Sequence, residues 1–298
     1  MYERLYPGMS WADHAAHWPL AAHSQHLSAG GVHWHVQRMG QGPALLLLHG
    51  TGSGSFSWRG LMPLLAAHFE VIAPDLPGHV FSSYGPPGAL SLPGMSEALR
   101  ALLLQLAVEP VALLGHSAGA AVAAHMVLHH PRLAGRPVVG LNPAWLPLGG
   151  AAAWLFPPMA WLARLNPASA WTLSRLARRA GAVEDTLARV GSHLDAQGLA
   201  LYREVLAHPG HVHGVLQMMA AWQIAPLARA LPRLTQPVLL HIGAQDRTVP
   251  PALSDQAMAL LPHAERIVAQ GLGHLAHEED PAGTAAQLLP WLRMHTGH

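Results

Sequence analysis

The chain has 298 residues, of which 51% are hydrophobic and 11% are charged, and its formal net charge is +1 at pH 7. This length and apolar content predict one large globular domain or a core with an insertion, and the near-zero charge argues against nucleic acid as a partner. The sequence has no cysteine and all 17 basic residues are arginine, which excludes disulfides, thiolate nucleophiles and lysine-dependent chemistry.

Strand and helix patterns alternate through the first half of the chain. Residues 1–20 are charged and lack an apolar core, which argues against a signal peptide and favours a cytoplasmic protein. Residues 32–37 alternate like a half-exposed strand, and the apolar run 43–48 is typical of a strand covered on both faces. The patterns that follow predict a helix at 61–67, a strand at 69–73, a helix at 95–106, a strand at 111–114, a helix at 120–128 and a strand at 137–141. This order predicts a doubly wound, mostly parallel α/β sheet.

The sequence between strand 111–114 and helix 120–128 has the pattern G-x-S-x-G, as Gly115-His116-Ser117-Ala118-Gly119. In a nucleophile elbow the serine occupies a strained turn that exposes its hydroxyl, and the flanking glycines let strand and helix pass closely. The bare pattern arises by chance in a chain rich in glycine and alanine. Its strand–turn–helix setting nevertheless favours Ser117 as a nucleophile, with the His116 side chain pointing away from it and either lining the pocket or packing.

The alternation stops between residues 145 and 234, where only helical patterns interrupted by prolines occur. It resumes with a strand at 237–243, a helix at 253–261, a strand at 266–269 and a helix at 281–294. We therefore expect a core domain at 1–144, a helical cap at 145–234 and the rest of the core at 235–298. Within the cap, the apolar stretch 146–162 is too short and too interrupted for a membrane span, so we expect a surface or lid segment that contacts a membrane peripherally.

A serine hydroxyl is a weak nucleophile and needs a base and a group that orients the base. Asp246 follows strand 237–243, and His274 lies in a glycine-flanked loop after the last strand, so the order is Ser, Asp, His. We expect Ser117 to attack, His274 to take and return its proton, and Asp246 to hold the imidazole. Asp246 could instead be a turn or helix-capping residue.

Three other side chains compete for these roles. Asp75 precedes the serine and is expected to shape a turn, and Asn142 ends the strand where some relatives carry the acid. His277 lies close to His274, but the acidic residues that follow it predict a solvated helix start.

The developing oxyanion needs backbone N–H donors. We expect one at Ala118, at the start of the helix, and a second at Thr51 in the loop after strand 43–48. Together with His116, we expect Trp145 and Trp222 to contact the substrate. The tryptophans and methionines of the cap are large and adaptable enough for a broad apolar ligand, although at helical spacing they also suit a core between cap and sheet.

The chain has 23 histidines, which invites a search for a metal site. The pairs His33/His35, His129/His130 and His211/His213 have no suitable third ligand nearby, and the sequence contains no H-E-x-x-H motif. We expect no metal and no organic cofactor.

Five segments together resemble the α/β-hydrolase superfamily. They are His49-Gly50-Thr51-Gly52, Pro74-Asp75-Leu76-Pro77-Gly78-His79, the elbow at 115–119, Gly243-Ala244-Gln245-Asp246 and Gly273-His274. Val80 departs from this pattern, because relatives commonly have a second glycine there. More narrowly, residues 34–40, 92–95, 191–195 and 271–279 resemble the magnesium chelatase accessory family of bacteriochlorophyll biosynthesis.

The residues favour a serine hydrolase that acts on an ester or related acyl bond of a bulky hydrophobic substrate. The narrower resemblance implies a role near magnesium insertion into protoporphyrin, with a tetrapyrrole as substrate and magnesium chelatase as a partner. The alternative is a non-catalytic tetrapyrrole-binding or chelatase-assisting protein on the same scaffold. The serine at the elbow disfavours dehalogenase and epoxide hydrolase chemistry, which needs a carboxylate there.

Overall fold

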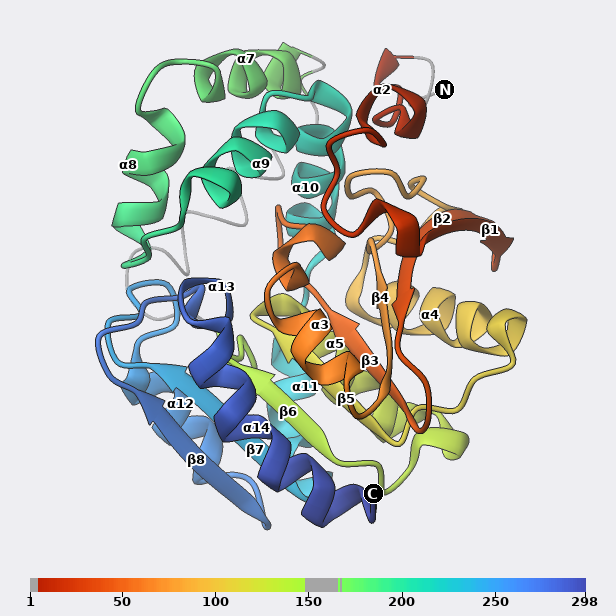
Figure 1. Cartoon of the computed structure of the whole chain (residues 1–298), viewed down its shortest axis with the longest axis vertical. Coiled ribbons are helices and arrows are strands. Elements are labelled where there is room, and N and C mark those ends of the chain that lie inside the picture. Colours follow the sequence, from red (N-terminus) through yellow and green to blue (C-terminus); the bar gives the residue numbers. More distant parts are fainter. Residues whose placement is uncertain (1–4, 148–165, 167) are drawn as a thin grey trace.

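The computed structural model describes residues 5–147, 166 and 168–298 (Figure 1). Trp154 and Trp161 of the predicted cap, and residues 148–162 of the predicted membrane-facing stretch, lie outside the described residues. In the described part of the chain, no helix has the length and apolar character that crossing a membrane requires.

The centre of the molecule is an eight-stranded sheet with the strand order β1-β2-β4-β3-β5-β6-β7-β8. The strands are β1 (Ser24–Ala29), β2 (Val32–Met39), β3 (Ala44–Leu48), β4 (Glu70–Pro74), β5 (Ala112–His116), β6 (Val138–Leu141), β7 (Val238–Gly243) and β8 (Ala264–Ala269). The pairs β1–β2 and β2–β4 are antiparallel, and the pairs from β4 to β8 are parallel. The predicted mostly parallel α/β sheet is confirmed, with β1 as an additional strand.

Strand β3 shows why the central strands read as unbroken apolar runs. Leu45 and Leu47 pack into one hydrophobic cluster, and Leu46 and Leu48 pack into another on the opposite face of the sheet. All four are completely buried. Because successive side chains of a strand point to opposite faces, a strand covered on both sides must be apolar at every position.

Helices cover both faces of the sheet (Figure 1). On one face lie α3 (Leu61–Ala66) and α14 (Pro281–Thr296); on the other lie α4 (Leu92–Leu106), α5 (Ala118–His129), α11 (Ala225–Ala230) and α12 (Pro251–Met258). The remaining short helices of the core are α2 (Trp11–His14), α13 (Ala276–Glu279), η1 (Ala21–His23), η2 (Ser55–Trp58), η3 (Pro131–Leu133) and η4 (Leu231–Arg233).

Strand β2 differs from its predicted half-exposed pattern, because His35 and Gln37 are buried along with the apolar residues. The N-terminal segment covers their side of the strand: the Gln37 amide donates to the Pro19 carbonyl oxygen at 2.7 Å, and the Trp11 ring lies 5.0 Å from that of His35. His35 and Gln37 are buried because a segment that is distant in the sequence covers them, and the periodicity of β2 cannot predict such a contact.

The described residues between β6 and α11 form the helices called the insertion helices below, which are α7 (Ala168–Ala177), α8 (Ala182–Arg189), α9 (Ala196–Leu206) and α10 (Pro209–Ala221). Figure 1 shows α7, α8 and α9 gathered at one end of the molecule. A hydrophobic cluster joins Leu201 and Val205 of α9 to Phe56, Val80 and Leu275, which lie in loops after β3, β4 and β8. Since parallel strands end at a common edge, the insertion helices cover the edge where such sheets carry their active sites.

Candidate active site

Ser117 occupies a strained turn between β5 and α5, with φ 51° and ψ −115°. A non-glycine residue rarely adopts such angles, which cost about 1–3 kcal/mol. The flanking glycines are sterically required. A methyl group built at Gly115 would lie 2.4 Å from the Ala120 nitrogen, and one built at Gly119 would lie 2.0 Å from the Leu48 carbonyl oxygen. The turn therefore contacts the backbone of α5 and of β3 with no room for a side chain at either glycine, which is the close packing that a nucleophile elbow requires.

Asp246 and His274 form a buried hydrogen-bonded pair. The His274 Nδ1–H donates to Asp246 Oδ2 at 2.7 Å, and His274 and Asp246 are 7% and 4% exposed. The backbone N–H groups of Thr248 and Val249 donate to Asp246 Oδ1 at 2.7 and 2.9 Å. With its proton on Nδ1, the imidazole has a lone pair on Nε2, which is the form that a general base requires.

Asn142, expected from the sequence only as a rival to the acid, contacts Asp246 directly. It lies directly after β6 with a φ of 47°, is completely buried, and its amide donates to Asp246 Oδ2 at 2.6 Å. The carboxylate therefore accepts hydrogen bonds at both oxygens. The signal in the sequence was its position at the carboxyl end of a strand neighbouring β7, but its partner was not predictable.

His116 holds His274 next to the elbow. Its Nε2–H donates to the His274 carbonyl oxygen at 2.9 Å, and the two rings lie 4.8 Å apart. Burial lowers the pKa of His116 well below its ordinary value, so this ring is neutral. Both Ser117 and His274 lie in the described part of the chain, and no hydrogen bond joins the serine hydroxyl to the imidazole there. Such bonds are often loose without substrate.

The loop after β3 lies against the elbow. A methyl group at Gly50 would lie 2.7 Å from His116 Nδ1 and 3.2 Å from Ser117 Cβ. Thr51 follows in this loop, and Ala118 begins α5, where first-turn N–H groups lack partners within the helix. Their roles as oxyanion donors stay predictions.

The two tryptophans predicted to contact substrate lie at the core. Trp145 is fully buried in the cluster beneath α5, with its indole 3.0 Å from the point where a Gly140 methyl would stand. Trp222 is partly buried against the same cluster. Substrate contact by these residues stays a prediction.

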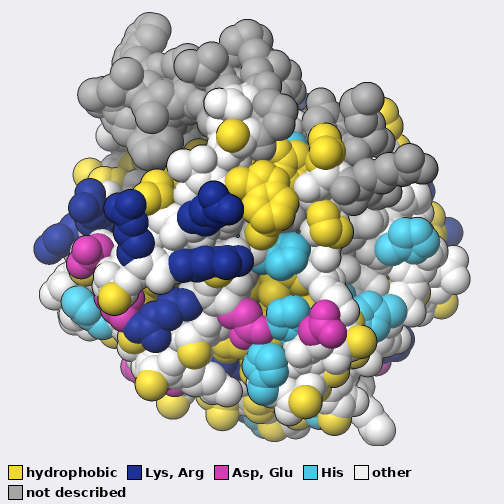
Figure 2. Space-filling model, turned by 90° about the horizontal axis from the view of Figure 1, so that it is seen from above, with side chains coloured by type: hydrophobic (Ala, Val, Ile, Leu, Met, Phe, Trp, Pro, Cys, Tyr) yellow, Lys and Arg dark blue, Asp and Glu magenta, His cyan; other side chains and the backbone are white. Residues whose placement is uncertain are grey.

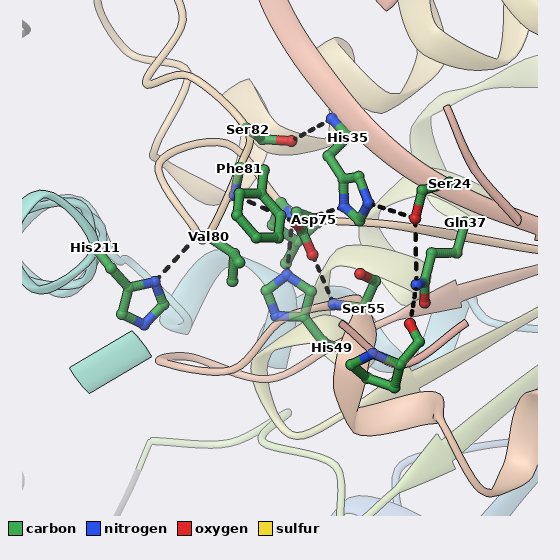
Figure 3. Close-up of polar contacts among 12 residues, drawn as sticks. Ser24, His35, Gln37, His49, Ser55, Asp75, Val80, Phe81, Ser82 and His211 are labelled. Carbon is green, nitrogen blue, oxygen red and sulfur yellow. Dashed lines mark hydrogen bonds and ion pairs between the residues drawn. The ribbon is translucent and has the colours of Figure 1, made fainter. Parts of the chain in front are cut away.

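Asp75 belongs to a second polar network, shown in Figure 3. Its carboxylate accepts from His35 Nδ1–H at 2.8 Å, from the Ser55 N–H at 2.6 Å and from the Phe81 N–H at 3.3 Å. Burial alone would raise the pKa of Asp75, but His35 and the other donors lower it to about 2. Asp75 thus ties together β2, the loop after β3 and the loop after β4, which is more than the turn that it was expected to shape.

This network contains a second row of Ser, His and Asp, because the Ser24 hydroxyl lies 2.9 Å from His35 Nε2. The row differs from an active site in its surroundings. Ser24 begins an extended strand rather than a strained turn, and His35 has no exposed surface. Hydrogen-bond order alone does not make a nucleophile.

The expectation of a solvated helix start at His277 is wrong. His277 is 1% exposed, with its ring 4.7 Å from Trp58 and 4.6 Å from His116, and Glu278 beside it is also buried. Glu278 accepts from Arg59 Nη1 at 2.5 Å. The ion pair with Arg59, which is distant in the sequence, makes burial of the Glu278 carboxylate possible, whereas Asp280 at the end of this acidic segment is exposed.

Several of the described histidine rings pack against other rings, for example His49 against His79 with ring centroids 5.1 Å apart. Within residues 5–147, 166 and 168–298, no group of three or more His, Asp or Glu side chains could hold a metal ion.

The sequence model of the alpha/beta hydrolase fold family matches residues 43–281. The chain is 39% identical to the "Magnesium-chelatase 30 kDa subunit" of Rhodobacter capsulatus, over 93% of this chain and 97% of that protein. It is 32% identical to a "Pimeloyl-[acyl-carrier protein] methyl ester esterase" of Xanthomonas oryzae pv. oryzae, over 80% of this chain and 91% of that protein. A solved thermophilic esterase from Thermogutta terrifontis superposes with a TM-score of 0.72 at 22% identity, covering 91% of this chain and 99% of that one, and so shares the fold.

Proposed function

The chain belongs to the α/β-hydrolase fold family, and from that premise we propose that it is a serine hydrolase that cleaves an ester or related acyl bond of a bulky hydrophobic substrate. The observation that carries this proposal is the buried Asp246–His274 pair, held by His116 next to the strained Ser117. Similarity to esterases supports an ester as the bond cleaved.

In the proposed reaction, Ser117 Oγ attacks the substrate carbonyl carbon while His274 Nε2 takes the hydroxyl proton. The tetrahedral oxyanion is stabilised by the N–H groups of Ala118 and Thr51, and collapses to an acyl-enzyme as His274 returns the proton to the leaving alcohol. Water, deprotonated by His274, then attacks the acyl carbon, and His274 returns that proton to Ser117 Oγ as the acyl–oxygen bond breaks and the acid leaves. Asp246 keeps the imidazole oriented and stabilises its charged form.

We assign the insertion helices the role of the cap, within the predicted boundaries 145 and 234. Their packing on the loops after β3, β4 and β8 supports this. The similarity to a magnesium chelatase subunit supports a tetrapyrrole ester near the step of magnesium insertion as the substrate class.

The test is labelling with a fluorophosphonate, which reacts with activated serines, followed by peptide mass spectrometry. The purified protein is expected to carry one label, on Ser117, and to hydrolyse p-nitrophenyl esters. Ser117→Ala should abolish both. A wild-type protein that neither labels nor turns over any ester in a panel of acyl chain lengths would overturn the proposal.

The second candidate is a non-catalytic protein that assists magnesium chelatase or carries its tetrapyrrole. The observation that favours it is the 39% identity to a chelatase subunit. Complementation separates the two candidates: in a strain that lacks this gene, Ser117→Ala should fail to restore pigment synthesis if the protein is a hydrolase. Full restoration, with co-purification of chelatase subunits, would favour the accessory role.

Contact of the cap with a membrane remains part of this proposal, and α7 is the described element that suits it. Its Trp171, Leu173 and Leu176 are 46%, 42% and 38% exposed. Arg175 lies in the same helix, and Figure 2 shows arginines gathered beside hydrophobic side chains on this end of the molecule. Flotation with phosphatidylglycerol vesicles should recover the protein, and Trp171→Ala should weaken recovery. No recovery with either phosphatidylglycerol or uncharged vesicles would exclude this contact, whereas equal recovery with both would show that the arginines add nothing to it.

A further inference from the structure

Three consecutive residues of the loop after β3 each contact a side chain of the insertion helices. The Thr51 hydroxyl lies 3.8 Å from Met218 Sδ, the Gly52 carbonyl oxygen accepts from His211 Nε2–H at 3.2 Å, and the Ser53 hydroxyl lies 3.0 Å from the Tyr202 hydroxyl. The insertion helices therefore hold the segment that carries the predicted donor Thr51. This loop also lies against Ser117.

His211 joins two loops of the core through its two ring nitrogens. Its Nε2–H donates to Gly52, and its Nδ1 accepts from the Val80 N–H at 3.1 Å. Figure 3 shows the ring reaching from its helix toward the Val80 backbone. Both bonds together require the neutral ring with its proton on Nε2. Burial lowers the pKa of His211 to about 4, which keeps the ring in that form at neutral pH.

Helix α10 cannot shift easily relative to these loops. A methyl group at Gly214 would lie 1.8 Å from the Gly78 carbonyl oxygen, so helix and loop meet at backbone contact. Gly214 is three residues after His211 and lies on the same face of the helix. The His211 ring is therefore presented to Gly52 and Val80 from a fixed platform.

Tyr202 links the loop after β3 to Glu278 in α13. Its hydroxyl donates to Glu278 Oε1 at 2.8 Å and so accepts from the Ser53 hydroxyl. Arg59 Nη1 donates to the second oxygen of Glu278, which lies four residues after His274. A chain of hydrogen bonds thus connects the loop that carries Thr51 with the helix that follows the proposed base.

We propose that His211 and Tyr202 are positioning residues that hold residues 51–53 in the conformation in which the Thr51 N–H meets the oxyanion. The inference rests on the proposed function and deepens it: the insertion helices complete the oxyanion hole as well as cover the site. Gly52 has a φ of 77°, and a loop with such a residue has alternative conformations that the two contacts remove. Stabilisation of an oxyanion depends strongly on the placement of its donors, which is why loss of a positioning contact reduces turnover.

Two substitutions at His211 separate its contacts. Asparagine can place its oxygen near the position of Nδ1 and so keep the Val80 bond, but it does not reach Gly52. Glutamine can place its amide nitrogen near the position of Nε2 and keep the Gly52 bond. We expect His211→Asn to lower kcat for a p-nitrophenyl ester by about tenfold to hundredfold with KM nearly unchanged, and His211→Gln to keep kcat within about threefold of wild type.

His213→Asn is the matched control, because His213 lies on the same helix and stacks on Tyr6 at 4.0 Å instead. Tyr202→Phe is the second variant, and it should also lower kcat and slow fluorophosphonate labelling of Ser117. Thermal unfolding of each variant is followed by circular dichroism. If His211→Asn fails to fold, Tyr202→Phe decides.

The outcomes separate this inference from the proposed function. Wild type without labelling or turnover would remove the proposed function and this inference with it. Wild type that labels, with variants whose kcat stays within about twofold or whose KM alone rises, would overturn the positioning role and leave the hydrolase intact. A reduced kcat in His211→Asn, recovered in His211→Gln and absent in His213→Asn, would support it.

Discussion

One oxygen of the Asp246 carboxylate accepts hydrogen bonds from two side chains, the proposed base and an amide at the end of the neighbouring strand. Asp246 Oδ2 accepts from both His274 and Asn142, at 2.7 and 2.6 Å. The amide of Asn142 therefore restricts the carboxylate that orients the base, a role that depends on sheet order rather than sequence neighbourhood. β6 and β7 are adjacent parallel strands, so their ends meet.

This arrangement predicts a partial rescue by exchange. Asp246→Asn should reduce ester turnover by about 10⁴-fold, because the imidazole loses the acceptor that fixes its tautomer. Adding Asn142→Asp restores a carboxylate next to an amide with the two positions exchanged, and we expect it to recover at least about tenfold of that loss. Steady-state kinetics of the single and double variants test this. A double variant no better than Asp246→Asn would show that only the β7 position serves.

The backbone strain at Ser117 predicts an effect on stability. Its φ of 51° and ψ of −115° suit glycine better than any residue with a Cβ atom. We expect Ser117→Gly to be about 1 kcal/mol more stable than Ser117→Ala, since relief of strain exceeds the entropy that glycine loses on folding. Urea unfolding of the two inactive variants measures the difference. Equal midpoints would mean that the elbow is not strained.

At the scale of elements, α10 is the helix whose docking matters most for the site. It carries His211 and Met218, which contact the loop after β3, and Gly214, which touches the loop after β4. Glycine is a poor helix former, so a glycine inside α10 needs a packing reason. The backbone contact with Gly78 is that reason, because it leaves no room for a Cβ atom.

Gly214→Ala should therefore destabilise the protein despite the better helix propensity of alanine. We expect a loss of about 1–3 kcal/mol from overpacking, together with lower kcat as the helix moves away from the loop. Gly8→Ala is the control, because a methyl there meets no atom within 4 Å and the backbone is not in the left-handed region. Chemical unfolding and ester kinetics of both variants provide the readout, and an unchanged Gly214→Ala would contradict the close docking.

At the scale of the whole molecule, burial of many histidines makes stability depend on pH. Desolvation lowers the pKa of His125, His211 and His213 to about 4, and lowers the pKa of His79, His116 and His277 well below the ordinary value. In the unfolded chain these groups titrate near about 6.5. Between about pH 6.5 and 4 the unfolded state binds more protons, so the free energy of unfolding falls as the pH falls.

Glu278 acts in the opposite direction. Burial raises its pKa to about 7, so the folded state binds the extra proton below that pH and this residue alone favours the fold on acidification. With several histidines against one glutamate, we expect the urea midpoint to fall steadily from about pH 7 to about pH 5. His213→Asn should reduce this slope by at most about 1.4 kcal/mol per pH unit. A midpoint that rises on acidification would contradict this balance.

The sequence alone was enough for the fold class and for the residues of the elbow. The unbroken apolar run at β3 predicts a strand that is buried on both faces, as the structure has it. Gly115 and Gly119 indicate a backbone contact that leaves no room for a side chain. These features are local, because they depend on the period of the chain and on the space at one turn. The order of Ser117, Asp246 and His274 along the chain is also visible in the sequence, and the catalytic roles of these residues stay a proposal.

Tertiary structure decided which side chains meet. Four contacts join residues that are 40 to 219 positions apart in the sequence. They are Asn142 with Asp246, His35 with Asp75, Glu278 with Arg59 and His211 with Gly52. No periodicity encodes such pairs, since they follow from strand order, from the covering N-terminal segment and from the docking of α10. The prediction that His277 is solvated was wrong for the same reason. The acidic residues beside His277 suggested an exposed segment, but Glu278 is buried because it pairs with the distant Arg59.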